Sequence, residues 1–206
     1  VQLHHAGIRS PPAIIGEACV GASEDEETGA RGLSTEEVEQ LVEDFIAAAE
    51  RCQAAGYDGV ELHGAHGYIL CQFLSAETNR RTDQYGGSAA NRERMVREII
   101  AGIRARCRPD FNLGIRLSPE RFGLKLREVL DFVQSLMNEA QLDYIDMSFW
   151  DSWKEPTEEE FQGRHLMSWF NELDRGETRL GACGKIMSAE VKWCYFLDLL
   201  AVRLAN

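Results

Sequence analysis

Apolar residues recur at helical spacing in residues 34–56, the most regular stretch of the chain. They stand three and four positions apart, which places them on one face of a helix. Ser34 and Glu37 match a capping box at the start, and Gly56 is a natural stop at the end. The apolar positions are Val38, Leu41, Val42, Phe45, Ile46 and Ala49. This pattern predicts an amphipathic helix that packs one face on a core.

Short β-branched segments alternate with further helical segments along the rest of the chain. Strands are expected at residues 1–6, 57–63, 112–118, 143–150, 179–186 and 199–204. Helices are expected at residues 91–107, 125–140, 165–173 and 189–196. Strands separated by helices predict parallel pairing through right-handed crossovers. The alternation fits either a doubly wound sheet or part of a (β/α)₈ barrel.

The polar residues favour the barrel. Gln2, His63, Arg116 and Lys185 each lie at or near the end of a different predicted strand, and no GxGxxG follows any strand. Barrels build their sites in this way, with one polar group from each of several strand ends. A full barrel takes about 250 residues, so we predict one α/β domain over residues 1–206 that is an incomplete (β/α)₈ TIM barrel. The long loop at residues 8–32 is expected to form part of a lid.

Composition excludes several classes of function. The formal charge of -12 opposes binding to nucleic acid or to anionic membrane surfaces, because both are polyanions. No apolar run approaches the roughly 20 residues that cross a bilayer. The six cysteines form no CxxC pair, which argues against a zinc ribbon or a redox motif. We therefore expect a soluble cytoplasmic protein with reduced, mostly buried thiols.

Residues 61–68 read ELHGAHGY, with two histidines in a stretch too rich in glycine to favour a helix. Three interpretations compete for His63 and His66. They could bind a metal ion together with Glu61 or His5, as in a metal-dependent barrel hydrolase, although no HExxH glutamate is present. They could be hydrogen-bonded residues that stiffen a loop. They could also donate N–H groups to a carbonyl or nitro oxygen of a substrate, as an oxyanion hole made of side chains.

The surrounding sequence favours the third interpretation. Residues 58–95 read DGVELHGAHGYILCQFLSAETNRRTDQYGGSAANRERM, which strongly resembles the Old Yellow Enzyme family of flavin-dependent oxidoreductases. The resemblance extends upstream to QLHHAGIRS, which is similar to the family's QLxHAGR segment, and downstream to LGIRLSPE. Several motifs in the same order make this a specific signal.

The resemblance implies a (β/α)₈ barrel that holds FMN at the carboxyl ends of its strands. It also implies a two-step reaction, in which NADH or NADPH reduces the flavin and the flavin passes the hydride to an electron-poor alkene such as an enone. His63 and His66 would hydrogen-bond the activating carbonyl oxygen, where charge builds up as the hydride arrives. Tyr68 would supply a proton or form part of the pocket wall.

Four residues match positions at which the family binds FMN. Gln2 would bond the pyrimidine edge of the flavin, and Arg116 would lie beside N1 and the C2 oxygen. Gly184 and Arg203 would bind the phosphate, although Val202 stands where the family has glycine. Two further histidines are adjacent in the first segment, and the resemblance matches His5 to the histidine of the family's HAG segment. His5 is expected to have a structural role, and His4 is expected on the other face of its strand.

The resemblance also predicts that the chain is truncated at both ends. It places Val1 within the third barrel strand, so that the chain covers about strands 3 to 8, and it makes the end after strand seven look shortened. Unpaired edges and an uncovered apolar face would then make the chain poorly stable and its FMN binding weak. The alternative function is a non-catalytic, truncated remnant that no longer holds FMN. The identity of the alkene, the choice between NADH and NADPH, and the formation of a homo-oligomer stay open.

Overall fold

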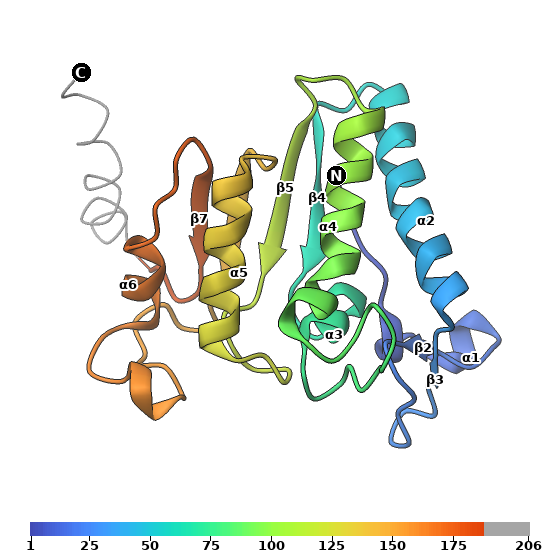
Figure 1. The fold of residues 1–206 in the computed structure, drawn as a ribbon, viewed down its shortest axis with the longest axis horizontal. Helices are drawn as coiled ribbons and strands as arrows, with labels where there is room; N and C mark the ends of the chain where they lie inside the picture. The colour runs from blue at the N-terminus through green and yellow to red at the C-terminus, as the bar shows by residue number, and fades with distance from the viewer. Residues whose placement is uncertain (188–206) are drawn as a thin grey trace.

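A computed structural model describes residues 1–187 and contains one five-stranded parallel sheet (Figure 1). The strand order β1-β4-β5-β6-β7 follows the order along the chain. The strands are β1 (Gln2–Leu3), β4 (Gly59–Gly64), β5 (Asn112–Leu117), β6 (Tyr144–Ser148) and β7 (Arg179–Cys183). Each strand pairs with its neighbour in parallel. This sequential parallel order is that of adjacent strands in a barrel wall, as the alternation predicted.

Helices lie between the strands, four of them at the predicted places and α3 in addition. They are α2 (Thr35–Ala54), α3 (Ile69–Leu74), α4 (Ala89–Arg106), α5 (Leu126–Glu139) and α6 (Leu166–Asn171). The capping box of α2 is present, since Ser34 Oγ accepts from Glu37 N at 3.2 Å and the Glu37 carboxylate accepts from Ser34 N at 2.8 Å. None of the helices within residues 1–187 has the length and apolar character to span a membrane. The predicted helix at 189–196 and strand at 199–204 lie outside the described residues.

The two faces of the sheet differ in chemistry. The face toward the helices is apolar and buried, and α2, α4 and α5 lie together in front of the sheet in Figure 1. Its side chains are Val60, Leu62, Leu113, Ile115, Ile145 and Met147. The opposite face carries Glu61, His63, Arg116, Tyr144 and Asp146, because side chains alternate along each strand. The expectation of an uncovered apolar face is therefore wrong for this sheet.

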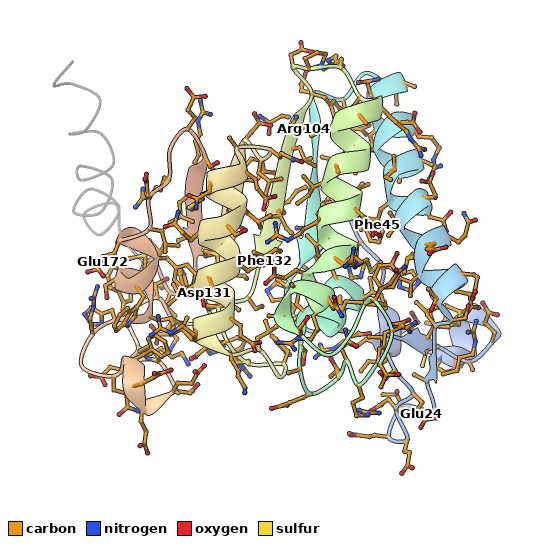
Figure 2. The ribbon with its side chains drawn as sticks, viewed as in Figure 1. Glu24, Phe45, Arg104, Asp131, Phe132 and Glu172 are labelled. Carbon is orange, nitrogen blue, oxygen red and sulfur yellow. The ribbon has the colours of Figure 1, made fainter. Side chains whose placement is uncertain are left out.

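The core lies between the sheet and its helices. Phe45 on α2 and Phe132 on α5 are 5% and 3% exposed, and Figure 2 shows both among the packed helices, with Glu24 at the edge of the molecule. Three of the five described cysteines are buried, and none of the five is in a disulfide. Cys194 lies outside the described residues. Apolar burial on one face thus leaves the other face available for polar groups.

The segment at residues 8–32 is tied to the rest of the domain by Arg81. It contains the end of η1 (Gly7–Arg9), the short helix α1 (Pro12–Ile15), and the paired strands β2 (Val20–Gly21) and β3 (Arg31–Gly32). Arg81 donates to the carbonyl oxygens of Ala22, at 3.0 Å, and of Leu33, and it forms an ion pair with Asp83. Residues 11–18 are exposed throughout. The role of this segment as a lid stays a prediction.

Replacing Arg81 with methionine should lower the free energy of unfolding by about 3 kcal/mol, because it removes the ion pair with Asp83 and the hydrogen bonds to the two backbone oxygens. Urea unfolding followed by circular dichroism would measure this loss. Arg31→Met is the matched control, because Arg31 forms an exposed ion pair with Glu37 and should matter much less. Equal losses in the two variants would contradict the anchoring role.

Candidate functional site

One row of polar side chains crosses the sheet near the carboxyl ends of its strands. The register pairs His63 of β4 with Arg116 of β5, and Arg116 with Asp146 of β6. Paired residues of parallel neighbours point to the same face, so these three side chains lie on the face away from the helices. The sequence predicted His63 and Arg116 as site residues, and the structure brings them together.

The turn after β4 carries His66 back toward this row. Its backbone is left-handed, with a φ of 61°, and its N–H donates to Ser118 Oγ at 3.0 Å. His66 Nδ1 lies 3.3 Å from His63 Nε2, and His66 Nε2 lies 2.7 Å from Ser148 Oγ. A non-glycine residue in this conformation is strained, and such strain clusters at ligand sites. The turn therefore holds the two imidazoles in contact.

Gly67 explains why this stretch must be rich in glycine. Its φ is 72°, a conformation that other residues rarely adopt. A Cβ at this position would also lie 2.9 Å from the ring of Phe122 and 3.1 Å from Arg9 Nη2. The glycine thus lets two side chains from other loops approach the histidine turn closely.

Both histidines are held in the neutral form. Burial, His66, His4 and Arg116 together lower the pKa of His63 to about 4. Burial, Arg116 and Arg9 lower the pKa of His66. Neutral imidazole has one N–H donor and one acceptor. His63 Nδ1 is buried and has no hydrogen-bond partner among the described residues.

Arg116 is fixed by β6 and β7. Its Nη2 donates to Ser148 Oγ and to Cys183 Sγ, each at 3.0 Å, and its Nε lies 3.3 Å from Asp146 Oδ2. Burial raises the pKa of Asp146, the Arg116 charge lowers it, and Glu61 raises it further. Because it is held on three sides, the guanidinium presents a positive charge in one position.

A cavity of about 200 Å³ opens beside this cluster. His66, Arg116, Ser148, Cys183 and Gly184 all line it, and the loop after β5 forms another wall. His63 is not among the lining residues and lies behind His66. Gly184 has a φ of 139°, and a Cβ there would collide with the carbonyl oxygen of Phe149. The backbone of Phe149 can therefore lie against the segment after β7 only because this residue is glycine.

Tyr68 packs beside His63 together with a histidine that was expected elsewhere. The ring centroids of His4 and Tyr68 are 4.3 Å apart, and those of His63 and Tyr68 are 5.3 Å apart. The expected placement of His4 on the other face is wrong, because Leu3 takes the core face and His4 lies 5.2 Å from His63. His5 Nδ1 accepts from Gly7 N at 3.1 Å, which agrees with a structural role.

Gln2 is not brought into the cavity, and a second predicted cofactor residue, Arg203, cannot be placed. Gln2 donates to Glu61 and lines a separate cavity of about 370 Å³ at the amino ends of the strands, with Tyr144 on its far wall. Arg203 and Val202 lie outside the described residues. The predicted roles of Gln2 and Arg203 in FMN binding therefore stay predictions.

Sequence reasoning missed Ser148, Asp146 and Cys183. Their signal was the alternation in DYIDMSFW and RLGAC, which places each of them on the same face as Arg116 once the register is known. Within residues 1–187, no three histidine, cysteine, aspartate or glutamate side chains form a group that could hold a metal ion. The described site thus consists of two imidazoles beside one fixed guanidinium, to which Ser148, Cys183 and Asp146 present acceptor atoms.

Comparisons with known proteins agree on one family. The model of the NADH:flavin oxidoreductase / NADH oxidase family matches residues 1–164. The probable NADH-dependent flavin oxidoreductase YqiG of Bacillus subtilis is 37% identical over 201 residues, which cover 92% of this chain and 54% of that protein. 12-oxophytodienoate reductase 2 of Arabidopsis thaliana is 46% identical over 99 residues, which cover 48% of this chain and 26% of that protein. This chain therefore spans about half the length of the first relative and less of the second.

Solved structures show the same likeness. Morphinone reductase in complex with tetrahydroNAD matches with a TM-score of 0.75 and 30% identity, over 96% of this chain and 58% of that one. Histamine dehydrogenase from Rhizobium sp. 4-9 matches with a TM-score of 0.77 and 28% identity, over 98% of this chain and 30% of that one. The arrangement of strands and helices is thus shared over nearly the whole chain.

An NMR titration of the histidine rings should show His63 titrating near pH 4 and His66 below the ordinary value of 6.5. In the unfolded chain both titrate near 6.5, so below this pH the unfolded state binds more protons than the folded state. Folding stability should therefore fall as the pH drops from about 6.5 to 4. His63→Gln should reduce this loss, and an unchanged pH dependence in that variant would contradict the neutral, buried state of His63.

Proposed function

The chain belongs to the NADH:flavin oxidoreductase / NADH oxidase family, and we propose that it forms the carbonyl-binding part of an FMN-dependent oxidoreductase. The family match confirms the resemblance to the Old Yellow Enzymes, and the structural matches confirm a partial (β/α)₈ barrel. In the proposed reaction, hydride passes from NADH or NADPH through FMN to an electron-poor alkene. The observation that carries the proposal is the neutral pair His63 and His66 beside the fixed Arg116. The free cysteines support a reducing, cytoplasmic location.

The residues around the cavity fit FMN. Arg116 offers a rigid positive charge, which suits the N1 and C2 oxygen edge of a flavin because negative charge collects there on reduction. Gly184 lines the same cavity as Arg116, and its backbone is proposed to contact the phosphate. Bound FMN would supply the hydride chemistry that no side chain of this protein can perform. Gln2 and Arg203 are proposed to complete the binding of the ring and the phosphate.

His63 and His66 are proposed to hold the carbonyl oxygen of the alkene. Their low pKa values keep them neutral, so each ring has one N–H and adds no net charge to the pocket. Both can donate to the ligand oxygen only when the contact between His63 Nε2 and His66 Nδ1 is replaced by contacts with the ligand. The unpartnered Nδ1 of His63 supports this role, because a ligand oxygen would satisfy a buried group that now lacks a partner. Donors that are positioned in advance stabilise the charge on the oxygen most strongly in the transition state.

Tyr68 is proposed to supply the proton that completes reduction. Its ring is fixed by contacts with His4 and His63 and lies under the guanidinium of Arg9. Its hydroxyl makes no hydrogen bond to another residue within the described part of the chain, so it is available to a ligand. If Tyr68 only forms part of the pocket wall, its ring is needed and its hydroxyl is not.

Replacing His63 or His66 with alanine should lower the rate at which cyclohex-2-enone reoxidises the reduced, FMN-loaded protein by about 10²–10³-fold. Stopped-flow absorbance of the flavin would measure this rate. Reoxidation by dioxygen serves as the internal control, because it does not depend on a carbonyl donor. Equal losses with both oxidants, or no loss with the enone, would contradict the proposed function.

Tyr68→Phe should lower the enone-dependent rate by about 10²-fold, because the variant keeps the ring but removes the proton. Binding of FMN should change little in the same variant, since the packed ring is retained. A wild-type rate in Tyr68→Phe would assign this residue to the pocket wall.

A further inference from the structure

The strand register places two rows of residues across the open face of the sheet. The row nearer the carboxyl ends of the strands runs through His63, Arg116, Asp146 and Gly181. The row nearer the amino ends runs through Gln2, Glu61, Gly114, Tyr144 and Arg179. Asp146 in the first row and Glu61 in the second have no part in the proposed reaction, although both lie beside residues that do.

The Asp146 carboxylate lies between Arg116 and the glycine of the next strand. Its Oδ2 is 3.3 Å from Arg116 Nε. A Cβ on Gly181 would lie 3.1 Å from Asp146 Oδ1, so a side chain at this position of β7 would crowd the carboxylate. The side chains of Arg116 and Asp146 are only 27% and 26% exposed, and water and salt therefore screen their charges less than those of a surface pair.

The contact between Asp146 and Arg116 is one of charge and not a hydrogen bond. Arg116 Nε is buried, and it has no hydrogen-bond partner among residues 1–187. In contrast, Nη2 of the same guanidinium donates to Ser148 Oγ and to Cys183 Sγ. Ser148 and Cys183 therefore supply the hydrogen bonds that orient the guanidinium, whereas Asp146 supplies a negative charge beside it.

Glu61, the acidic group of the other row, interacts with different partners. Gln2 donates to its carboxylate at 2.5 Å. Burial raises the pKa of Tyr144, and the charge of Glu61 and a hydrogen bond to it raise this pKa further. Arg116 and Glu61 are also the charged groups that act on Asp146 itself, with opposite signs. Glu61 is thus engaged by Gln2 and Tyr144, and Asp146 is the acidic group that faces the guanidinium.

We propose that the Asp146 carboxylate offsets part of the Arg116 charge and thereby lowers the reduction potential of the bound flavin. This inference rests on the proposed function, because it takes Arg116 to lie beside N1 and the C2 oxygen of FMN. A guanidinium without a counter-charge would stabilise the negative charge of reduced flavin more strongly and make that flavin a weaker reductant. Asp146 acts on the flavin through Arg116 and does not need to touch either cofactor or substrate.

Asp146→Asn tests the inference, because it keeps the shape of the side chain and removes its charge. In the FMN-loaded chain at pH 8, the variant should favour reduced over oxidised FMN about tenfold more than the unaltered chain does. This is a rise of about 30 mV in the midpoint potential of a two-electron couple, which a spectroscopic titration against a reference dye would measure. Asp131→Asn is the matched control, since it removes the same charge from an exposed position on α5 (Figure 2), and it should leave the potential unchanged.

The ring of His66 gives a second readout that needs no flavin. Burial lowers the pKa of His66, and the Arg116 charge lowers it further. If Asp146 offsets that charge, Asp146→Asn should lower the pKa of His66 again, and Arg116→Gln should raise it. An NMR titration of the FMN-free chain would measure both shifts, with Asp131→Asn as the control that shows neither.

The sign of the change separates a charge effect from a purely structural one. If Asp146 only held Arg116 in place, Asp146→Asn would release the guanidinium, so the pKa of His66 would rise and the flavin potential would fall. Either result overturns the inference, as does a potential that stays unchanged. Failure of the unaltered chain to bind FMN overturns the proposed function and with it the effect on the potential, whereas a lower pKa of His66 in Asp146→Asn still supports the offset of the Arg116 charge.

Discussion

The parallel register of β4, β5 and β6 is the constraint on which the site depends. It places His63, Arg116 and Asp146 side by side on the face that the helices leave open. The apolar residues of the same strands are buried against α2, α4 and α5, so a shift by one residue would exchange the two faces. Core packing therefore fixes the position of the polar row. The same strand register therefore buries the face of the sheet that is turned toward the helices and assembles the site on the other face.

Strained backbone in the loops then orients side chains that the strand register alone does not position. Left-handed backbone at His66, Arg121 and Phe122 directs side chains from two loops toward one cavity. Contacts between the loops hold this strain in place, through Ser118 on the backbone of His66 and through Phe122 against Gly67. The two loops therefore support each other, and Arg9 joins them from the first turn of the chain. A site of this kind is positioned before a ligand arrives, which reduces the cost of binding.

Much of this arrangement could be predicted from the sequence. The period of apolar residues and the caps at Ser34 and Gly56 located α2, and the alternation of strands and helices gave the barrel. The partners of Arg116 could not be predicted, because Ser148 and Cys183 meet it only through strand register. The face of His4 was misjudged because β1 is two residues long and carries little pattern. The left-handed turn at Arg121 was hidden as well, since neither it nor Phe122 is a residue type that marks such a turn.

The central claim is that the fixed Arg116 and the neutral histidine pair form the wall of a flavin site. The most direct measurement is a fluorescence titration of the purified chain with FMN, followed by anaerobic addition of NADH and of NADPH to separate samples. The account predicts weak but measurable binding of FMN that Arg116→Gln weakens further, and bleaching of the bound flavin by at least one of the two nucleotides. No binding of FMN, or binding that is unaffected by Arg116→Gln, would contradict it.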